Sequence, residues 1–225
     1  MTRAILTDIE GTTTPIRFVT EVLYPYARER LASYLREHAA DAEIAGIIAE
    51  VRSQAGRELD LEAVIAQLHA WMDADRKIAP LKDLQGLLWT QGYADGELST
   101  EIYDDAARGL RAWHAAGIGL YVYSSGSVQA QKAIFAHTDH GDLGALFSGY
   151  FDTRVGHKRD ADSYRRIAAA IALSPDDILF LSDVREELDA ARAAGLRTAW
   201  LVRDAMPAGP AAAHRRVRSF DALRP

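Results

Sequence analysis

The chain has 225 residues, of which 48% are hydrophobic, so it can form one domain or one domain with an insert. Its formal net charge of −6 argues against nucleic acid as a partner, because nucleic-acid binding needs a basic patch or stripe. The lack of cysteine excludes disulfides, thiolate metal sites and cysteine nucleophiles. The sequence begins without a signal region, and its apolar runs are shorter than the ~20 residues that cross a bilayer. We therefore expect a cytoplasmic, monomeric protein with no membrane partner.

The first predicted element is a buried strand over residues 4–7, and a long helical stretch follows it. Apolar side chains recur at helical spacing over residues 20–38, 44–55, 61–75 and 82–91, with no convincing strand between them. This stretch is long for a connection after a strand, which usually adds only a few residues to its helix. We therefore predict an inserted, all-helical domain over residues 18–93.

Strands and helices alternate in the rest of the chain. Strands are predicted over residues 118–123, 150–153, 177–181 and 198–202, and helices over residues 104–116, 128–136, 163–172 and 186–194. Such alternation favours a parallel sheet with helices on both faces. The predicted fold class is therefore α/β, a doubly wound parallel sheet formed by residues 1–17 and 94–225. The tail after Asp204 is rich in Ala, Pro and Arg and carries little signal for secondary structure.

Polar side chains that can do chemistry stand at the ends of three predicted strands. The candidates are Asp8 and Glu10 after the first strand, Ser124 and Ser125 after the second, Asp183 after the fourth, and Lys158 in a loop between them. The carboxyl ends of parallel strands share one edge of the sheet, so these groups can meet in one crevice. Carboxylates that hold Mg²⁺, a cation and hydroxyl donors together suit phosphoryl transfer.

Each candidate also has an ordinary structural explanation. An Asp after a strand is often a turn or N-cap residue, which covers Asp8 and Asp183. Ser124 and Ser125 could simply cap the helix that follows them. Lys158 alone would usually be a solvated surface lysine. The order of the candidates, each in the expected place, favours one common site over separate structural roles.

These motifs resemble those of the haloacid dehalogenase superfamily, and they occur in that family's order. The motifs are the segment 8–12, the strand that ends at Ser124, then Lys158, and Asp183 with Glu187 four residues later. The resemblance is closer to the enolase-phosphatase (acireductone synthase) family of methionine salvage, over segments 8–16, 75–77, 81–82, 84–86, 121–128, 151–152, 156–158 and 163–164. Glu10 supports this, because most phosphatases of the superfamily have Asp at that position. The helical insert resembles the cap domain of the superfamily.

The resemblance implies a reaction and a role for each candidate. The substrate would be 2,3-diketo-5-methylthiopentyl 1-phosphate, which is first enolised and then dephosphorylated through an aspartyl phosphate. Asp8 would be the nucleophile, Glu10 the general acid and base, and Lys158 the neutralising cation. Mg²⁺ would be held by Asp8, the backbone carbonyl of Glu10, and Asp183. The phosphate would be bound by Ser124, Ser125 and Lys158, and Glu187 would orient Lys158 or a metal-bound water.

Two questions stay open at this point. Glu10 is one candidate for the enolisation base, and the insert residues that face the diketone are undecided: Arg76, Lys77, Lys82 and Gln85 could bind it or could form a solvated surface. The alternatives for the whole protein are a different phosphatase or a dehalogenase on the same fold, and a binding protein that has lost the reaction.

Overall fold

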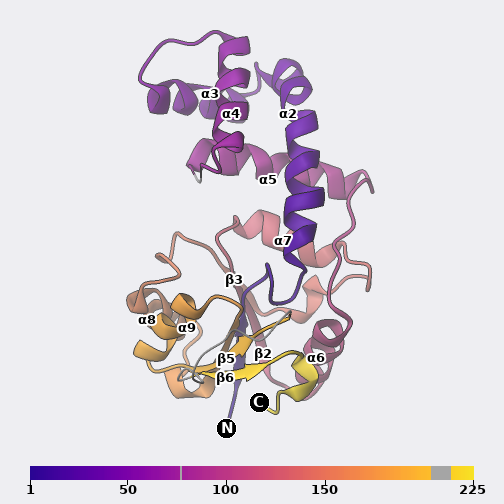
Figure 1. Ribbon diagram of the computed structural model, residues 1–225, viewed down its shortest axis with the longest axis vertical. Coiled ribbons are helices and arrows are strands. Elements are labelled where there is room, and N and C mark those ends of the chain that lie inside the picture. Colours follow the sequence, from indigo (N-terminus) through magenta and orange to yellow (C-terminus); the bar gives the residue numbers. More distant parts are fainter. Residues whose placement is uncertain (77, 204–213) are drawn as a thin grey trace. The chain divides into compact units, whose positions relative to one another are not determined.

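The computed structural model describes residues 1–76, 78–203 and 214–225, and the chain divides into two compact units (Figure 1). One unit comprises Met1–Phe18 and Ser99–Pro225, and the other is the continuous segment Val19–Leu98. Over the described residues, no helix is long and apolar enough to span a membrane.

The first unit is built on a six-stranded parallel sheet with strand order β3-β2-β1-β4-β5-β6. The strands are β1 (Ala4–Thr7), β2 (Gly119–Tyr123), β3 (Gly149–Phe151), β4 (Ile178–Ser182), β5 (Arg197–Leu201) and β6 (Arg215–Val217). β1 and β4 are buried along their whole length, which explains why both read as nearly continuous apolar runs.

The order of the strands fixes where chemistry can take place. The chain winds from β1 outward to β3, then returns to β4 beside β1 and winds outward on the other side. The boundary between β1 and β4 is therefore the point at which the winding reverses, and ligands bind at the carboxyl ends of strands at such points. Thr7, the last residue of β1, pairs with Val122 on one side and Leu181 on the other. The residues just beyond these three positions therefore lie at one level of the sheet.

Helices cover both faces of this sheet (Figure 1). The helices of this unit are α1 (Ile16–Phe18), a single short turn, and α6 (Asp104–Ala115), α7 (Val128–Ala136), α8 (Ala161–Ala170) and α9 (Arg185–Ala193), with 3-10 turns at Gly144–Leu146, Pro175–Asp177 and Phe220–Ala222. On one face, Tyr164 of α8 and Leu188 of α9 join Leu6 and Phe180 of the central strands in a buried cluster. On the other side of the sheet in Figure 1, α6 packs against β2.

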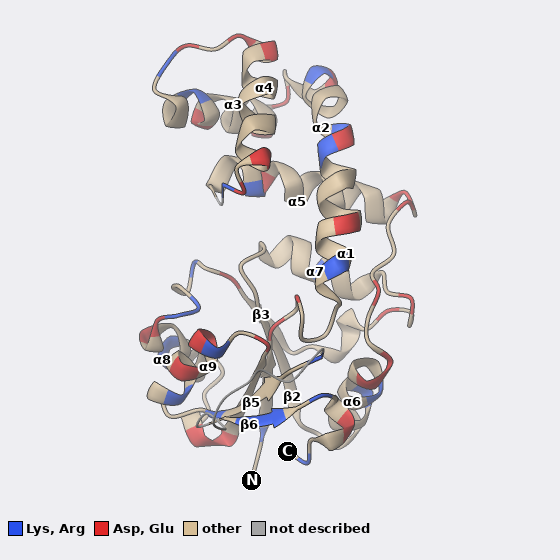
Figure 2. Cartoon of the chain, viewed as in Figure 1, with Lys and Arg blue, Asp and Glu red and all other residues tan. Residues whose placement is uncertain are grey.

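The second unit consists of helices in its described residues. A π-helical turn (Val19–Leu23) leads into α2 (Tyr24–His38), α3 (Ala42–Ala55), α4 (Leu61–Asp73) and α5 (Ala79–Ala94). Its own core includes Leu31, Val51, Leu68 and Leu84, all of which are fully buried. The surface helices of both units mix charges: Arg occurs together with Asp or Glu along α2, α8 and α9 (Figure 2).

The predicted fold class is confirmed, and the structure adds elements that the sequence did not predict. The parallel sheet with helices on both faces is present, with element ends within a few residues of those predicted. No element was predicted in the tail, and the structure shows that it contains β6, which pairs with β5, and the turn around the buried Phe220. The predicted tail segment 204–213 lies outside the described residues. That the helical unit acts as a cap stays a prediction.

Candidate active site

Asp8 is the centre of the site, at the first position after β1. Its backbone N–H donates to the carbonyl of Leu181 in β4, which extends the sheet pairing by one residue. Its carboxylate is buried, with Oδ1 2.5 Å from Lys158 Nζ and Oδ2 3.2 Å from Thr12 Oγ1, which donates to it. The two oxygens of this carboxylate are therefore held by a cation on one side and by a hydroxyl on the other.

The loop after Asp8 folds back on itself through its own threonines. The backbone N–H groups of Thr12, Thr13 and Thr14 all donate to the carbonyl of Ile9, and the Thr13 hydroxyl donates to the same carbonyl. Every threonine of this segment is buried. The run of small hydroxylated residues thus forms a tight turn around the carbonyl of Ile9, and the Thr14 hydroxyl is buried there without a hydrogen-bond partner.

Gly11 brings this loop against the end of β4. Its φ of +75° is in the region that favours glycine, and a Cβ at this position would lie 2.2 Å from Asp183 Oδ2. Only a residue without a side chain permits this approach. The glycine after Glu10 therefore lets the carboxylate of Asp183 pack directly against the loop that carries Asp8.

Lys158 is held from its backbone as well as from its ammonium group. The Tyr164 hydroxyl donates to the Lys158 carbonyl at 2.7 Å, and the Ser163 hydroxyl donates to the His157 carbonyl at 2.8 Å. The hydroxyl of Tyr123, the last residue of β2, donates to the carbonyl of Gly156 at 2.9 Å. Lys158 is buried, so the interpretation of it as a solvated surface lysine is wrong.

Glu187 is the second carboxylate that contacts Lys158. Its Oε2 lies 2.8 Å from Lys158 Nζ and accepts a hydrogen bond from Ser182 Oγ at 3.0 Å. Ser182 Oγ in turn accepts from the backbone N–H of Val184. The first turn of α9 is thereby tied to the end of β4 and to the lysine.

The cluster carries more negative than positive charge. Burial and the neighbouring Asp8 raise the pKa of Glu10 to about 7 and that of Asp183 to about 7, and they also raise the pKa of Glu187. Burial alone would lower the pKa of Lys158, but the charges of Asp8 and Glu187 raise it above its usual range. The charged form of Lys158 is thus favoured, and this one cation does not neutralise all the carboxylates around it.

These residues fit a divalent cation. Asp183 Oδ1 is buried without a hydrogen-bond partner, and oxygen ligands are those that hard divalent ions prefer. The predicted ligands are two carboxylates and one backbone carbonyl, at Asp8, Asp183 and Glu10. This is consistent with the finding that, in the described part of the chain, no three Asp, Glu, His or Cys side chains are grouped to hold a metal by themselves.

Ser124 and Ser125 occupy different environments at the end of β2. Ser124 is fully buried, and its hydroxyl lies 3.5 Å from Glu10 Oε1 and accepts from the Gly126 N–H at 3.1 Å. Ser125 is exposed on the same turn. The structure therefore brings Ser124 to the carboxylates and leaves Ser125 exposed.

Gln131 holds this turn, and sequence reasoning did not identify it. Its side-chain amide donates to the carbonyls of Gly126 and Phe151 at 2.8 and 2.9 Å, so it joins the turn after β2 to the end of β3. The signal was a polar residue on the apolar face of α7, three and four positions before Ile134 and Phe135.

The four predicted substrate contacts of the helical insert belong to the second unit. Arg76 is exposed, Lys82 is partly buried and Gln85 is buried, both in α5. Lys77 lies outside the described residues. Their role stays a prediction.

The comparisons with known proteins agree with this geometry. A family model described as haloacid dehalogenase-like hydrolase matches residues 2–195. Enolase-phosphatase E1 of Methylococcus capsulatus is 53% identical over 100% of this chain and 99% of its own length. Enolase-phosphatase E1 of Pseudomonas aeruginosa is 55% identical over 97% of this chain and 96% of its own length.

The solved structures give the same result. The UTR4 protein of Saccharomyces cerevisiae superposes with a TM-score of 0.84 and 30% identity, over 99% of this chain and 100% of that one. CbbY from Rhodobacter sphaeroides, at a TM-score of 0.62 and 20% identity over 99% of this chain and 96% of its own, shares the fold. A family model over most of the chain and relatives above 50% identity decide the assignment: the chain belongs to the enolase-phosphatase E1 family of haloacid dehalogenase-like hydrolases.

Proposed function

We propose that this chain is a Mg²⁺-dependent enolase-phosphatase of methionine salvage. It converts 2,3-diketo-5-methylthiopentyl 1-phosphate to the acireductone 1,2-dihydroxy-3-keto-5-methylthiopentene and phosphate. The observation that carries this proposal is the buried Asp8 carboxylate, with Lys158 at 2.5 Å on one oxygen, beside the unpartnered oxygen of Asp183. Full-length relatives named enolase-phosphatase E1 support the choice of reaction.

Asp8 is the nucleophile in this proposal. One of its carboxylate oxygens attacks phosphorus, the bond from phosphorus to the substrate oxygen breaks, and an aspartyl phosphate forms. Lys158 stays protonated throughout and neutralises the carboxylate, which lets an anion approach the phosphate. Water then attacks phosphorus, which releases phosphate and regenerates Asp8.

Glu10 moves the protons in both halves of the phosphatase reaction. Protonated Glu10 gives its proton to the leaving oxygen, and the resulting carboxylate takes a proton from the attacking water. Its raised pKa of about 7 supports a group that exchanges protons near neutral pH. Ser124, 3.5 Å from Glu10 Oε1, and the exposed Ser125 bind phosphate oxygens.

The divalent metal of the family is Mg²⁺ in this proposal, held by Asp8, the carbonyl of Glu10, and Asp183. When bound, it supplies positive charge that offsets the phosphate and the developing enolate. The enolisation base is Glu10 or another group, and both alternatives stay open.

An assay with the diketone phosphate tests this function. We expect absorbance of the enol and release of inorganic phosphate, both of which need Mg²⁺ and stop with EDTA. Phosphate release without an enol would indicate a different phosphatase. Turnover of a haloacid that survives EDTA would indicate a dehalogenase, which needs no metal. Asp8→Asn should abolish turnover, and full activity in that variant would contradict the role of Asp8.

A further inference from the structure

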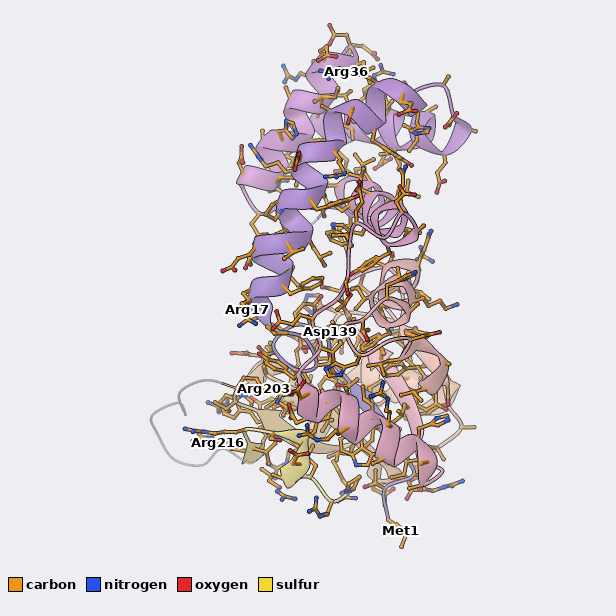
Figure 3. All side chains as sticks on the ribbon, turned by 90° about the vertical axis from the view of Figure 1, so that its right-hand side faces the viewer. Met1, Arg17, Arg36, Asp139, Arg203 and Arg216 are labelled. Atoms are coloured by element: carbon orange, nitrogen blue, oxygen red, sulfur yellow. The ribbon has the colours of Figure 1, made fainter. Side chains whose placement is uncertain are left out.

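Arg203 is a buried arginine two residues after β5, and it lies beside one end of α6 (Figure 3). Its side chain is 9% exposed, and its guanidinium donates hydrogen bonds to three acceptors. Nη1 lies 2.7 Å from Asp105 Oδ2 and donates to the carbonyl of Arg218 at 3.2 Å. The arginine therefore links the first turn of α6 to the C-terminal segment.

The remaining donors of Arg203 face the loop after β1. Nε and Nη2 both donate to the backbone carbonyl of Thr12, at 3.2 and 2.6 Å. Two donors on one carbonyl fix the direction of that peptide group more strictly than one donor would. Thr12 is itself fully buried, so water does not compete for this carbonyl.

Aromatic rings hold the guanidinium in place. Its Cζ lies 4.0 Å from the centre of the Tyr103 ring and 5.3 Å from that of Phe220. The backbone N–H of Tyr103 also donates to the carbonyl of Thr13, at 3.0 Å. Stacked and bidentate contacts of this kind need the planar fork of arginine, which lysine lacks.

Thr12 connects this arginine to the nucleophile. The carbonyl of Thr12 accepts from Arg203, and the hydroxyl of the same residue donates to Asp8 Oδ2 at 3.2 Å. A shift of the Thr12 peptide therefore moves the group that holds one oxygen of the Asp8 carboxylate.

We propose that Arg203 is a positioning residue for the reaction, and that it orients the Asp8 carboxylate through Thr12. This inference rests on the proposed function, because it takes Asp8 as the nucleophile. Arg203 does not touch the substrate in this account. Its contribution is to hold the attacking oxygen in line with phosphorus, where a displacement of ~1 Å can cost roughly 10²-fold in rate.

The first test replaces Arg203 and measures kcat and KM for phosphate release. Arg203→Met keeps the aliphatic part of the side chain and loses the guanidinium group. Arg203→Lys keeps the charge beside Asp105 but cannot bind Asp105 and Thr12 at the same time. We expect both to lower kcat by about 10- to 100-fold, with KM changed by less than about twofold. If Arg203→Met does not fold, Arg203→Lys alone gives the comparison.

Arg108→Met is the matched control. Arg108 Nη2 lies 2.8 Å from Asp221 Oδ2, so it also ties α6 to the C-terminal segment, but through Asp221 and not through the loop of Thr12. We expect its kcat to stay within about twofold of that of the unmodified enzyme. If Arg108→Met lost as much kcat as the Arg203 variants, the C-terminal segment would support the fold in general, and Arg203 would have no specific role in orienting Asp8.

The second test is a double-mutant cycle with Thr12→Val, which removes the hydroxyl that reaches Asp8. If Arg203 acts through Thr12, Arg203→Lys should cost about 10-fold or more in the unmodified enzyme and less than about threefold in Thr12→Val. Equal costs in both backgrounds would overturn the proposal. So would unchanged kcat in the Arg203 variants of an active enzyme, whereas an inactive unmodified enzyme would instead refute the proposed function.

Discussion

At the scale of single residues, the site is defined by an imbalance of charge. Asp8, Glu10, Asp183 and Glu187 influence one another, and Lys158 is the cation that contacts two of them, at 2.5 and 2.8 Å. Burial disfavours the charged form of the remaining carboxylates, and repulsion from Asp8 adds to this effect, so their pKa values rise. The surplus negative charge favours a divalent cation and a phosphate together over either one alone.

Glu10→Gln tests the proton-transfer role at this scale. The amide cannot protonate the leaving oxygen, so we expect phosphate release to fall by roughly 10²- to 10⁴-fold. Enol absorbance, recorded on the same sample, separates the open alternatives for the other half-reaction. If enol forms at the unmodified rate, Glu10 is not the enolisation base. If the rate of enol formation falls as much as the rate of phosphate release, Glu10 acts in both steps. Phosphate release at the unmodified rate would contradict the role proposed here.

Gly11→Ala tests the contact between the loop and Asp183. The new Cβ would lie 2.2 Å from Asp183 Oδ2 at a φ of +75°, so the loop or the carboxylate must move. We expect a loss of about 10²-fold in kcat and of roughly 1–2 kcal/mol in the free energy of unfolding.

Gly46→Ala is the matched control for this substitution. Gly46 lies inside α3 with open space where a Cβ would go, so alanine should raise stability by up to ~1 kcal/mol and leave kcat unchanged. Full activity in Gly11→Ala would show that the loop does not need its observed shape.

At the scale of elements, the C-terminal segment supports the site. Asp105 Oδ2, in the first turn of α6, lies 2.7 Å from Arg203 Nη1 and accepts from the Phe220 N–H at 2.6 Å. Burial would raise the pKa of Asp105, but these hydrogen bonds lower it below its ordinary value. The folded state therefore favours the ionised carboxylate at this position.

Asp105→Asn should show a pH-dependent loss of stability. Because the folded pKa is depressed, the stabilisation is complete above the ordinary value of 3.8 and is lost as the pH falls through the lower folded pKa. We expect the variant to unfold about 1–2 kcal/mol more easily at pH 7, and the difference to shrink below pH ~4. Urea unfolding at several pH values measures this, and a difference that grows as the pH falls would contradict it.

Elements and site residues differ in how far the sequence predicts them. β1 and β4 are predictable because burial on both faces makes them apolar runs, and strand ends locate Asp8, Ser124 and Asp183. β6 is not, because its three residues include two arginines and only one buried side chain. Arg203 and Gln131 donate hydrogen bonds to backbone carbonyls that are distant in sequence, and no local sequence pattern predicts such contacts.

At the scale of the whole molecule, the chain consists of two units with separate cores. The helical unit is one continuous segment of the chain, so it can be produced as a single fragment without the sheet. Leu31 and Leu68 are fully buried within its own cluster. We therefore predict that residues 19–98 fold alone into a helical domain with a cooperative thermal transition followed by circular dichroism.

A core variant provides the control for that fragment. Leu68→Ala should lower its free energy of unfolding by about 2–5 kcal/mol, and in so small a fragment this loss can abolish folding. A fragment that is helical but melts without cooperativity, in both forms, would show that its core depends on the other unit.

The central claim is that Asp8 carries the phosphoryl group during turnover, and rapid quenching tests it most directly. Enzyme with Mg²⁺ is mixed with the diketone phosphate, stopped in acid at successive times, and its peptides are analysed by mass spectrometry. We expect a phosphoryl group on Asp8 that forms before phosphate release and decays at the rate of release. Phosphate release with no phosphoryl group on Asp8 at any time would contradict this claim.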